Sequence, residues 1–338
     1  MVTMKDVAQA AGVSVSTVSH IVNGTRHVSD ELRARVIKVM EELDYHPNAL
    51  ARSLRMGETK TIGLIIPDSS NLFFAEIARA IEDAGYQHGY AVILCNSDGR
   101  SDKQQRYIRT LIDKQVDGVI FISNGEITAD LNYLLDNNIR VVMVDREVPG
   151  IDVDTVLLDN ELAGYQATRY LLELGHRCIA CIGVPPNLIP IAQRVAGYHR
   201  AMKEAGLELP TDYCIYGDTR IESGERAINR LLHLVPRPSA VFVCNDMMAI
   251  GVMRGARLLG ISVPEELSVV GFDDIALARA MCPALTTMAQ PIGEMGRLAT
   301  ELLIRRIKGE LHSPGRQRIT LTARLVIRES ASQCNSKD

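Results

Sequence analysis

Two spacings of apolar residues divide the chain into a short helical start and a long remainder of alternating strands and helices. In the first sixty residues apolar side chains recur every three to four positions, as in Met4, Val7, Ala8 and Ala11, which is the helical period. Further on, short continuous apolar runs alternate with amphipathic stretches, a pattern typical of buried strands and the helices that cover them. We therefore predict a small all-α domain followed by a larger α/β core.

Capping residues and a glycine mark the helices of the N-terminal domain. Thr3, with Asp6 three residues later, predicts the start of a first helix, and Gly12 ends it. Ser14 is the N-cap candidate of a second helix, and Ser29 that of a third. The spacing thus predicts two helices joined by a three-residue turn that contains glycine, with a third helix packed behind them.

The second helix has two faces of opposite character. Val18, Ile21 and Val22 form an apolar stripe that we expect to be buried. Short polar side chains that can approach base edges in a major groove lie on the other face: Ser16, Ser19, His20 and Asn23. This composition favours a DNA-binding helix-turn-helix domain over an ordinary three-helix bundle.

A short amphipathic segment follows the third helix. Asn48 can cap, and Gly57 can end, a helix of about eight residues, which is too short to be stable alone in water. Two leucines, Leu50 and Leu54, lie on one face of the predicted helix, and two arginines, Arg52 and Arg55, lie beside them. It is either a linker helix packed on the main body or a conditional helix whose leucine wedges between base pairs.

The remainder of the chain predicts two similar halves. The expected strands are 61–67, 90–96, 117–123 and 140–145 in the first half, and 178–183, 240–246 and 267–274 in the second. Amphipathic helices separate them, and the element order repeats. We therefore expect two doubly wound lobes with parallel sheets.

Polar and aromatic residues follow the ends of these strands. Ligands of open parallel sheets bind outside the carboxyl ends of the strands, so residues from different strands converge there. Aromatic faces can stack on a sugar ring, while carboxylates, amides and guanidinium groups pair with hydroxyls. Structural alternatives are a helix core for the two phenylalanines, a local ion pair for Asp145 with Arg146, and an N-cap role for Asp273. The candidate effector residues are Phe73, Phe74, Asp145, Arg146, Arg194, Asn245, Asp273 and Gln290.

Composition limits the cellular setting. The chain has 338 residues with 46% hydrophobic content, enough to fill a substantial core. Its net charge is −4, but the first sixty residues hold eight basic against seven acidic side chains, which permits nucleic-acid binding without requiring it. No apolar run approaches the roughly 20 residues of a membrane span, and the start lacks a secretory signal. We expect a cytoplasmic protein without membrane contact.

Catalytic and metal-binding signatures are missing from the sequence. Cys178 and Cys181 have the C-x-x-C spacing, but residues three apart on a strand point to opposite faces, so we expect no zinc. Seven cysteines, an odd number, suit a reducing compartment. The sequence contains no P-loop, dinucleotide fingerprint, zincin motif or nucleophile elbow. A binding protein without a cofactor is therefore favoured over an enzyme, and a transport-type sugar-binding protein is the alternative.

Several stretches resemble the lactose repressor (LacI/GalR) family of bacterial regulators: MKDVAQAAGVSVSTVSHIVNG, YHPNALARSLR and TIGLIIPDSSNLFFAEI, continuing through GFDD, LTTMAQP and RLVIRES. The resemblance implies a homodimer with a helix-turn-helix domain (1–46), a hinge helix (47–58) and a core like a periplasmic sugar-binding protein (61–338). It places the first lobe at about 61–159 and 291–320, and the second at about 160–290 and 321–332.

The resemblance also implies roles for residues. Val15, Ser16 and His20 match base-reading positions, and Arg26 matches a further DNA contact. Leu54 matches a leucine inserted at the centre of a palindromic operator, and Leu50 the point where two hinge helices touch. We expect the contacts with a pseudo-palindromic operator to come from Thr3, Ser14, Val15, Ser16, Thr17, His20, Asn23, Arg26, Leu50, Arg52, Leu54 and Arg55.

The strand-end residues resemble a ribose-binding type of site. Thr219 stands where such sites usually carry an aromatic residue, which leaves another pentose or a phosphorylated sugar open. The loop PPNLIP lacks the arginine of the purine-binding branch, and the long leucine heptad of the tetrameric lactose repressor is missing, so we expect a dimer. Effector binding should close the lobes and so favour or forbid pairing of the hinge helices.

Overall fold

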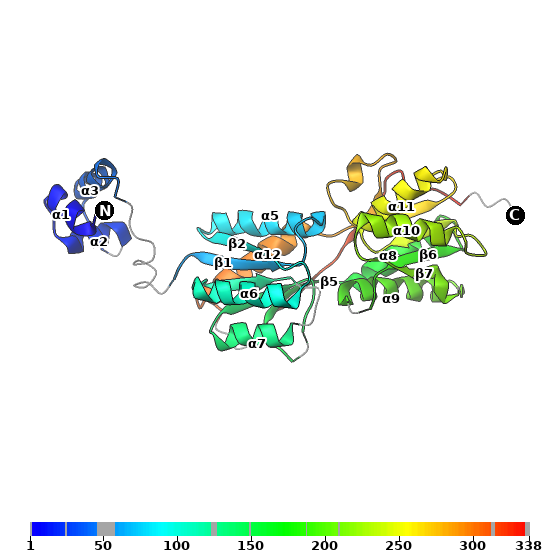
Figure 1. Ribbon diagram of the computed structural model, residues 1–338, viewed down its shortest axis with the longest axis horizontal. Helices are drawn as coiled ribbons and strands as arrows, with labels where there is room; N and C mark the ends of the chain where they lie inside the picture. The colour runs from blue at the N-terminus through cyan, green and yellow to red at the C-terminus, as the bar shows by residue number, and fades with distance from the viewer. Residues whose placement is uncertain are drawn as a thin grey trace. The chain divides into compact units, whose positions relative to one another are not determined.

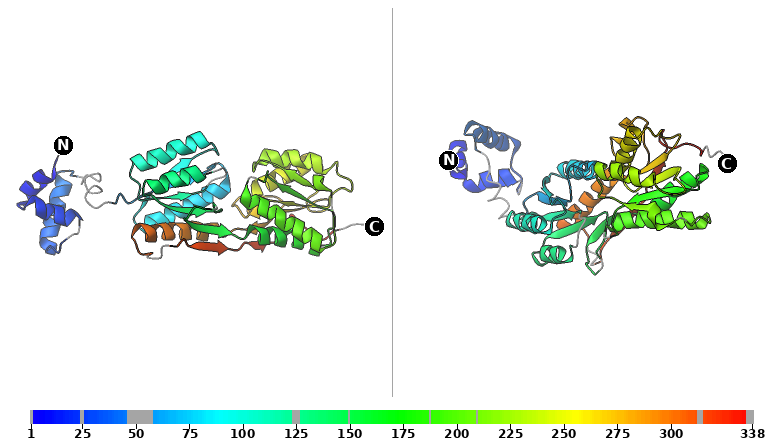
Figure 2. Two further views of the ribbon diagram at one scale, coloured as in Figure 1. Left: turned by 90° about the horizontal axis from the view of Figure 1, so that it is seen from below. Right: turned by 45° about the vertical axis from the view of Figure 1, so that its right-hand side comes forward.

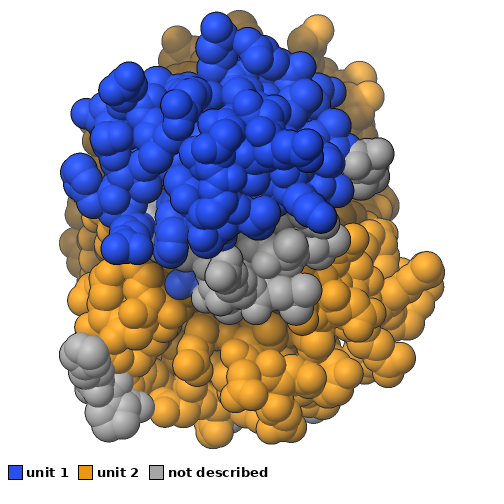
Figure 3. Space-filling view, turned by 90° about the vertical axis from the view of Figure 1, so that its left-hand side faces the viewer, with its two compact units in different colours: residues 1–60 blue, residues 61–338 orange. Residues whose placement is uncertain are grey.

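The computed structural model describes residues 2–23, 26–45, 58–122, 127–148, 150–186, 188–208, 210–311 and 315–334. It divides into two compact units, residues 1–60 and 61–338, which Figure 3 colours separately. The four hinge candidates Leu50, Arg52, Leu54 and Arg55 lie outside the described residues.

The first unit contains the helices α1 (Met4–Ala11), α2 (Val15–Asn23) and α3 (Asp30–Glu42) (Figure 1). The predicted capping box is confirmed, because the Asp6 N–H donates to Thr3 Oγ1 at 3.4 Å and the Thr3 N–H donates to the Asp6 carboxylate at 2.8 Å. Ser14 caps α2, since its Oγ accepts the Thr17 N–H at 3.1 Å. Ser29 occupies the predicted N-cap position of α3, but its side chain makes no capping hydrogen bond.

The three helices enclose a small core. Ser19 belongs to the buried side of α2, with only 8% of its surface exposed, so the prediction that it faces outward is wrong. The reason is that α2 contacts both α1 and α3, which buries a wider arc than one stripe of three apolar residues. The buried apolar residues are Val7, Ala8, Ala11, Val18, Ile21 and Val36.

The second unit is built on two six-stranded sheets, as the two-lobed α/β prediction requires. The first sheet has the order β11-β5-β4-β3-β1-β2 and is parallel throughout. The second has the order β12-β10-β9-β8-β6-β7, and its edge strand β12 runs antiparallel to β10, a departure from the expected parallel arrangement. The strands of the first sheet are β1 (Thr61–Ile66), β2 (Ala91–Asn96), β3 (Gly118–Phe121), β4 (Arg140–Val144), β5 (Asp154–Leu158) and β11 (Arg318–Leu321). Those of the second are β6 (Ile179–Gly183), β7 (Cys214–Tyr216), β8 (Ala240–Val243), β9 (Ser268–Asp273), β10 (Thr286–Ala289) and β12 (Arg324–Val326).

Helices cover both faces of each sheet. In the first lobe α5 (Leu72–Gln87) and α12 (Ile292–Ile307) lie on one face, and α6 (Ser101–Asp113) and α7 (Thr128–Asp136) on the other (Figure 1). Successive side chains of a strand point to opposite faces of the sheet, so each strand contributes to the apolar cluster on either side. In β1, Leu64 and Ile66 belong to one cluster and Ile65 to the other. In the second lobe α8 (Asn160–Glu173) pairs with α9 (Ile189–Glu204), and α10 (Ile221–Leu231) with α11 (Asp246–Leu258).

The chain passes between the two sheets three times. The crossings lie between β5 and α8, between β10 and α12, and between β11 and β12. Figure 2 shows the C-terminal part of the chain, coloured orange to red, running along both lobes. Asn160 and Gln290 stand at the first two crossings, and both side chains reach the site described next.

Candidate functional site

Residues from both lobes enclose a small inner cavity of about 50 Å³. Every predicted effector residue except Gln290 lines it, and Gln290 contacts a lining residue from outside. The structure thus brings together residues as far apart in the sequence as Asn71 and Asp273. The lining residues are Asn71, Phe73, Phe74, Asp145, Arg146, Leu188, Pro190, Ile191, Arg194, Thr219, Asn245 and Asp273.

Arg194 is held on several sides at the cavity wall. Its Nε donates to Asn160 Oδ1 at 2.8 Å and its Nη1 to the Cys244 carbonyl at 2.7 Å, while Nη1 lies 3.4 Å from Asp273 Oδ1. Its guanidinium stacks on the Phe272 ring, 3.7 Å from the ring centroid. Gly164 of α8 allows α9 to pack closely enough for Arg194 to contact Asn160. A Cβ atom at position 164 would lie 2.2 Å from the Arg194 carbonyl oxygen, so any other residue would push the two helices apart.

Two buried carboxylates face this arginine. Burial raises the pKa of Asp273 to about 6. The charge of Arg194 and the hydrogen bond from Gln290 Nε2, at 2.7 Å, lower this pKa, and the negative charge of Asp145 raises it. Burial also raises the pKa of Asp145, opposed by the charges of Arg194 and Arg146. Asp145 Oδ1 and Gln290 Oε1 are buried and have no hydrogen-bond partner among the described residues. Of the two, only Asp145 lines the cavity, and its unpartnered acceptor calls for a ligand group that donates a hydrogen bond.

Behind Asp273 lies a second carboxylate that the chain itself satisfies. Asp246 is fully buried, and its oxygens accept the Thr287 hydroxyl at 2.6 Å and the Ile275 N–H at 3.0 Å. Burial, followed by the negative charge of Asp273, raises the pKa of Asp246 well above its usual value. Asp246 therefore supports the strand ends and is not a candidate ligand contact.

The backbone is strained where the strands meet the cavity. Asp145, Thr219 and Asp273 have φ values of 75°, 72° and 122°. Residues other than glycine rarely have positive φ values of this size. Such conformations cost on the order of 1–3 kcal/mol each and gather at functional sites. Their grouping around one cavity is a structural sign of function that the sequence alone does not reveal.

Some predicted residues have structural roles as well. Asn245 caps α11, since its Oδ1 accepts the Met248 N–H at 3.1 Å, and its Nδ2 donates to the Thr219 carbonyl at 3.0 Å. Phe73 and Phe74 pack edge to face at 5.1 Å and belong to the core, as the structural alternative predicts, and both also line the inner cavity. The N-cap alternative for Asp273 is wrong, because no helix cap is formed by its side chain and its partners are Gln290 and Arg194.

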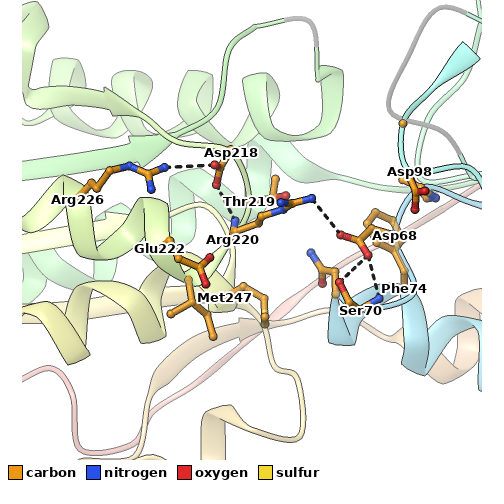
Figure 4. Close-up of a pocket in the computed structure, with 14 residues that line it drawn as sticks. Asp68, Ser70, Phe74, Asp98, Asp218, Thr219, Arg220, Glu222, Arg226 and Met247 are labelled. Atoms are coloured by element: carbon orange, nitrogen blue, oxygen red, sulfur yellow. Dashed lines mark hydrogen bonds and ion pairs between the residues drawn. The ribbon is translucent and has the colours of Figure 1, made fainter.

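A wider outer chamber of about 750 Å³ opens beside the inner cavity (Figure 4). It shares Asn71, Phe74 and Thr219 with the inner cavity. Arg220 of the second lobe lies 3.9 Å from Asp68 of the first, so one ion pair spans the chamber. No local sequence pattern singles out these residues, because exposed charged side chains are common on any surface.

Asn160 and Phe272 also belong to the site without being among the predicted residues. Asn160 follows β5, a five-residue strand that the apolar pattern does not reveal, and Phe272 lies within the predicted strand 267–274 and not at its end. Recognition of β5 would have placed Asn160 at a strand end and made it a candidate.

In the first unit the predicted DNA-contacting residues fall into three groups. Thr3, Ser14, Val15, Ser16 and Arg26 are exposed, with Val15 at 44%. Thr17 and His20 are half-buried, and Ser14 Oγ lies 2.8 Å from Thr17 Oγ1. The side chain of Asn23 is outside the described part of the structure, as are the four hinge candidates. The exposed start of α2 therefore presents hydroxyl groups and one valine.

The cysteine pair of the C-x-x-C spacing is separated in the fold. The Cys178 thiol donates to the Pro236 carbonyl at 3.4 Å, whereas Cys181 Sγ lies 3.9 Å from Cys244 Sγ. The two thiols thus have different neighbours. Among the helices that the structure describes, none combines the length and the apolar character needed to cross a bilayer.

Two family profiles match the chain. Residues 3–48 match the bacterial regulatory proteins of the lacI family, and residues 59–329 match the periplasmic binding proteins and sugar binding domain of LacI family. Among curated proteins, the ribose operon repressor of Escherichia coli K12 is 41% identical, covering 98% of this chain and 100% of the relative. The HTH-type transcriptional repressor PurR of Vibrio vulnificus is 38% identical, covering 99% of this chain and all of the relative.

Solved structures share the architecture. A lac repressor dimer bound to operator and the anti-inducer ONPF aligns with a TM-score of 0.85 and 27% identity, covering 98% of this chain and 99% of that one. A LacI family transcriptional regulator from Enterococcus faecium with bound ribose aligns with a TM-score of 0.72 and 30% identity, covering 81% of this chain and 99% of that one.

Proposed function

Because the chain belongs to the LacI family of bacterial regulatory proteins, we propose that it is a dimeric transcriptional repressor whose affinity for a pseudo-palindromic operator is switched by a small sugar. Proteins of this family are DNA-binding regulators, not enzymes. A regulator of this kind works on chromosomal DNA, so the cytoplasm is its proposed location.

The inner cavity is the observation that carries the effector proposal. Carboxylates, guanidinium groups and phenylalanines from both lobes meet there, and one acceptor of its lining, Asp145 Oδ1, has no partner among the described residues. A sugar hydroxyl would supply the missing donor, and a sugar ring would pack on Phe73 or Phe74. The ribose-bound relative from Enterococcus faecium and the ribose operon repressor support a pentose.

Operator recognition is proposed for the exposed side of α2. Ser16 and His20 would pair with base edges, and Val15 would contact a thymine methyl group. Two copies of the chain would place one α2 in each half of a palindrome, in the manner of the lac repressor dimer bound to operator.

The switch would act through the crossings between the lobes. Arg194 is hydrogen-bonded to Asn160 at the first crossing, and Asp273 to Gln290 at the second. A sugar that draws these groups together would bias the angle between the lobes, and so the pairing of the proposed hinge helices. A coupling of about 1–3 kcal/mol would change operator affinity roughly 5- to 150-fold.

The test begins with selection of duplexes from a random pool on the full-length protein. Affinity for a selected operator is then measured by fluorescence anisotropy while pentoses, hexoses, their phosphates and purines are titrated. We expect a palindromic sequence to emerge and a sugar to weaken its binding. Selection of no palindrome would refute the DNA-binding proposal, and the absence of any response to sugars would refute the sugar switch.

A further inference from the structure

Three thiols gather on one face of the second sheet. We propose that two of them form a peroxide-sensitive modification site, in which Cys214 is oxidised first and Cys181 then closes a disulfide with it, and that this disulfide weakens effector binding through α9. The thiol chemistry stands on its own, whereas its effect on the effector rests on the proposed function.

The pairing of the strands brings the three thiols together. Cys181 of β6 lies opposite Cys214 of β7, so the two side chains point to the same face of the sheet. On its other side, Cys181 Sγ lies 3.9 Å from the Sγ of Cys244, which directly follows β8. Neighbouring strands are about 4.7–4.9 Å apart, within the Cα–Cα range of about 4.4–6.8 Å that a disulfide requires. The backbone of β6 and β7 is therefore already at the spacing of a disulfide between these two residues.

The cluster runs from the edge of the sheet into its interior. β7 is an edge strand, and Cys214 keeps 8% of its surface exposed, whereas Cys181 and Cys244 are fully buried. His199 and Tyr216, which are hydrogen-bonded to Cys214, are both exposed. Hydrogen peroxide is little larger than a water molecule, so it meets Cys214 before it meets the two inner thiols.

The surroundings of Cys214 favour its thiolate, which is the reactive form of cysteine. The pKa of Cys214 is lowered to about 5, chiefly by a hydrogen bond from the Cys181 thiol and against the opposing effect of burial. Hydrogen bonds from His199 and Tyr216 contribute to this lowering of the pKa. Burial raises the pKa of Cys181 well above its usual value, so Cys181 stays a neutral thiol. The two residues thus differ as an attacking and a resolving cysteine should.

The oxidation balances with hydrogen peroxide as the only co-reactant. The Cys214 thiolate attacks one peroxide oxygen, the O–O bond breaks, and hydroxide leaves and takes a proton from solvent. The Cys181 sulfur then attacks the resulting sulfenic acid: an S–S bond forms, the S–O bond breaks, and the departing hydroxide takes the Cys181 proton. Two thiols are oxidised to one disulfide, and one peroxide is reduced to two water molecules. In the reducing cytoplasm proposed above such a disulfide is transient, as in redox sensors.

Helix α9 connects the thiols with the effector site. His199 of α9 is hydrogen-bonded to Cys214. Earlier in the same helix, Arg194 donates to the Cys244 carbonyl at 2.7 Å. A disulfide replaces the Cys214 thiolate with a neutral sulfur, which is a weak acceptor, so His199 loses its partner. The resulting adjustment of α9 should displace Arg194 from the wall of the inner cavity.

Mass spectrometry of the full-length protein tests the modification site. The reduced chain is treated with hydrogen peroxide, the remaining thiols are alkylated, and tandem spectra of the digest locate each link. We expect a peptide pair that has lost two hydrogen atoms and joins Cys214 to Cys181, and we expect dithiothreitol to separate it. The inference is overturned by the absence of oxidation, by oxidation confined to the exposed Cys282, or by a different disulfide in place of this one.

Matched serine variants separate the roles of the two cysteines. Cys214→Ser should abolish the link, and Cys181→Ser should leave a sulfenic acid at Cys214 that dimedone traps. Cys178→Ser is the control, because the Cys178 thiol donates to the Pro236 carbonyl at 3.4 Å and its loss should leave the link intact. A Cys214→Ser chain in which peroxide oxidises Cys181 at the wild-type rate would show that Cys214 is not the attacking residue. The spectra of the unsubstituted protein stand whether or not these variants fold.

Calorimetry with ribose tests the effect on the effector site. The oxidised chain should bind ribose about fivefold or more weakly than the reduced chain, dithiothreitol should restore the affinity, and peroxide should not change the affinity of Cys214→Ser. Equal affinities in the oxidised and reduced chains would overturn the coupling through α9. Binding of ribose by neither form would refute the proposed pentose effector and the coupling with it, and would leave the disulfide seen by mass spectrometry unaffected.

Discussion

The two units of this protein arrange their polar groups for recognition in opposite ways. In the first unit the candidate DNA contacts lie on the exposed side of one nine-residue helix, and Val15 is 44% exposed. In the second unit the candidate effector contacts are buried at several strand ends, and Arg194 and Asp273 are each 3% exposed. Loss of a hydrogen-bond partner costs an exposed polar group little free energy, because water replaces the partner. A buried polar group without a partner destabilises the protein. The two sites should therefore respond differently to the loss of one side chain.

The largest effect is expected at Arg194. Arg194→Ala removes the partner of the buried Asp273 carboxylate and of the Cys244 carbonyl, so it should lower the free energy of unfolding by about 3–5 kcal/mol and abolish the effector response. Thermal unfolding and calorimetry measure the two effects. The matched control is Arg200→Ala on the same helix, whose ion pair with Glu161 is exposed and should contribute less than about 1 kcal/mol. An equal loss of unfolding free energy in the two variants would contradict the prediction that the buried arginine contributes more than the exposed one.

His20→Ala should affect DNA binding alone. Loss of a base-edge contact should weaken binding to the selected operator by about 1–3 kcal/mol, roughly 5- to 150-fold, with no change in effector affinity, because α2 belongs to the other unit. Anisotropy and calorimetry provide the two readouts. His88→Ala, an exposed histidine of the second unit, is the control and should leave operator affinity unchanged. An unaltered operator affinity in His20→Ala would remove this residue from the proposed contacts.

Effector affinity should depend on pH through Asp273. Burial raises the pKa of this carboxyl to about 6 from a usual value of 3.8, while Arg194, Asp145 and Asp246 face it in the folded protein. The folded chain thus holds a proton that the unfolded chain releases, so this group contributes stability below about pH 4 that is lost as pH rises through about 6. A sugar hydroxyl donates best to the ionised form, so affinity should be about tenfold weaker at pH 5 than at pH 7.5.

Calorimetry at several pH values tests the dependence on Asp273. Asp273→Asn, which cannot ionise, should bind more weakly at neutral pH and show a flat profile between about pH 5 and 7.5. A profile that keeps its slope in this variant would assign the titration to another group.

The smallest effect is expected at the cap of α1. Thr3→Ala removes the side-chain half of the capping box and should destabilise the first unit by about 0.5–2 kcal/mol. Ser29→Ala is the control, because Ser29 makes no side-chain capping bond to α3 and its loss should cost less than about 0.5 kcal/mol. Chemical denaturation followed by circular dichroism compares them, and a larger loss in Ser29→Ala would contradict the structure.

Local sequence patterns predicted much of the fold. The seven expected strands are all present, because a continuous apolar run favours a strand. The expected burial fails for β2, an edge strand whose side chains are mostly exposed or half-buried. The strands that were missed, such as β5 and β7, have five residues and three residues. The burial of Ser19 was also missed, because the number of helices that contact α2 is not visible in the periodicity of α2 alone.

The sequence by itself determined the fold class, the α1 and α2 caps and the set of strand-end residues. The caps and strand ends each depend on a segment of fewer than about ten residues whose period acts locally, and the fold class follows from the order of such segments along the chain. Tertiary structure alone decided that Asn160 and Phe272 hold Arg194, that Asp145 and Gln290 each keep an acceptor with no partner among the described residues, and that Thr219 lines both pockets. These features depend on distances between segments far apart in the chain. Such distances are set by how two sheets and their crossings pack, and no local pattern records them.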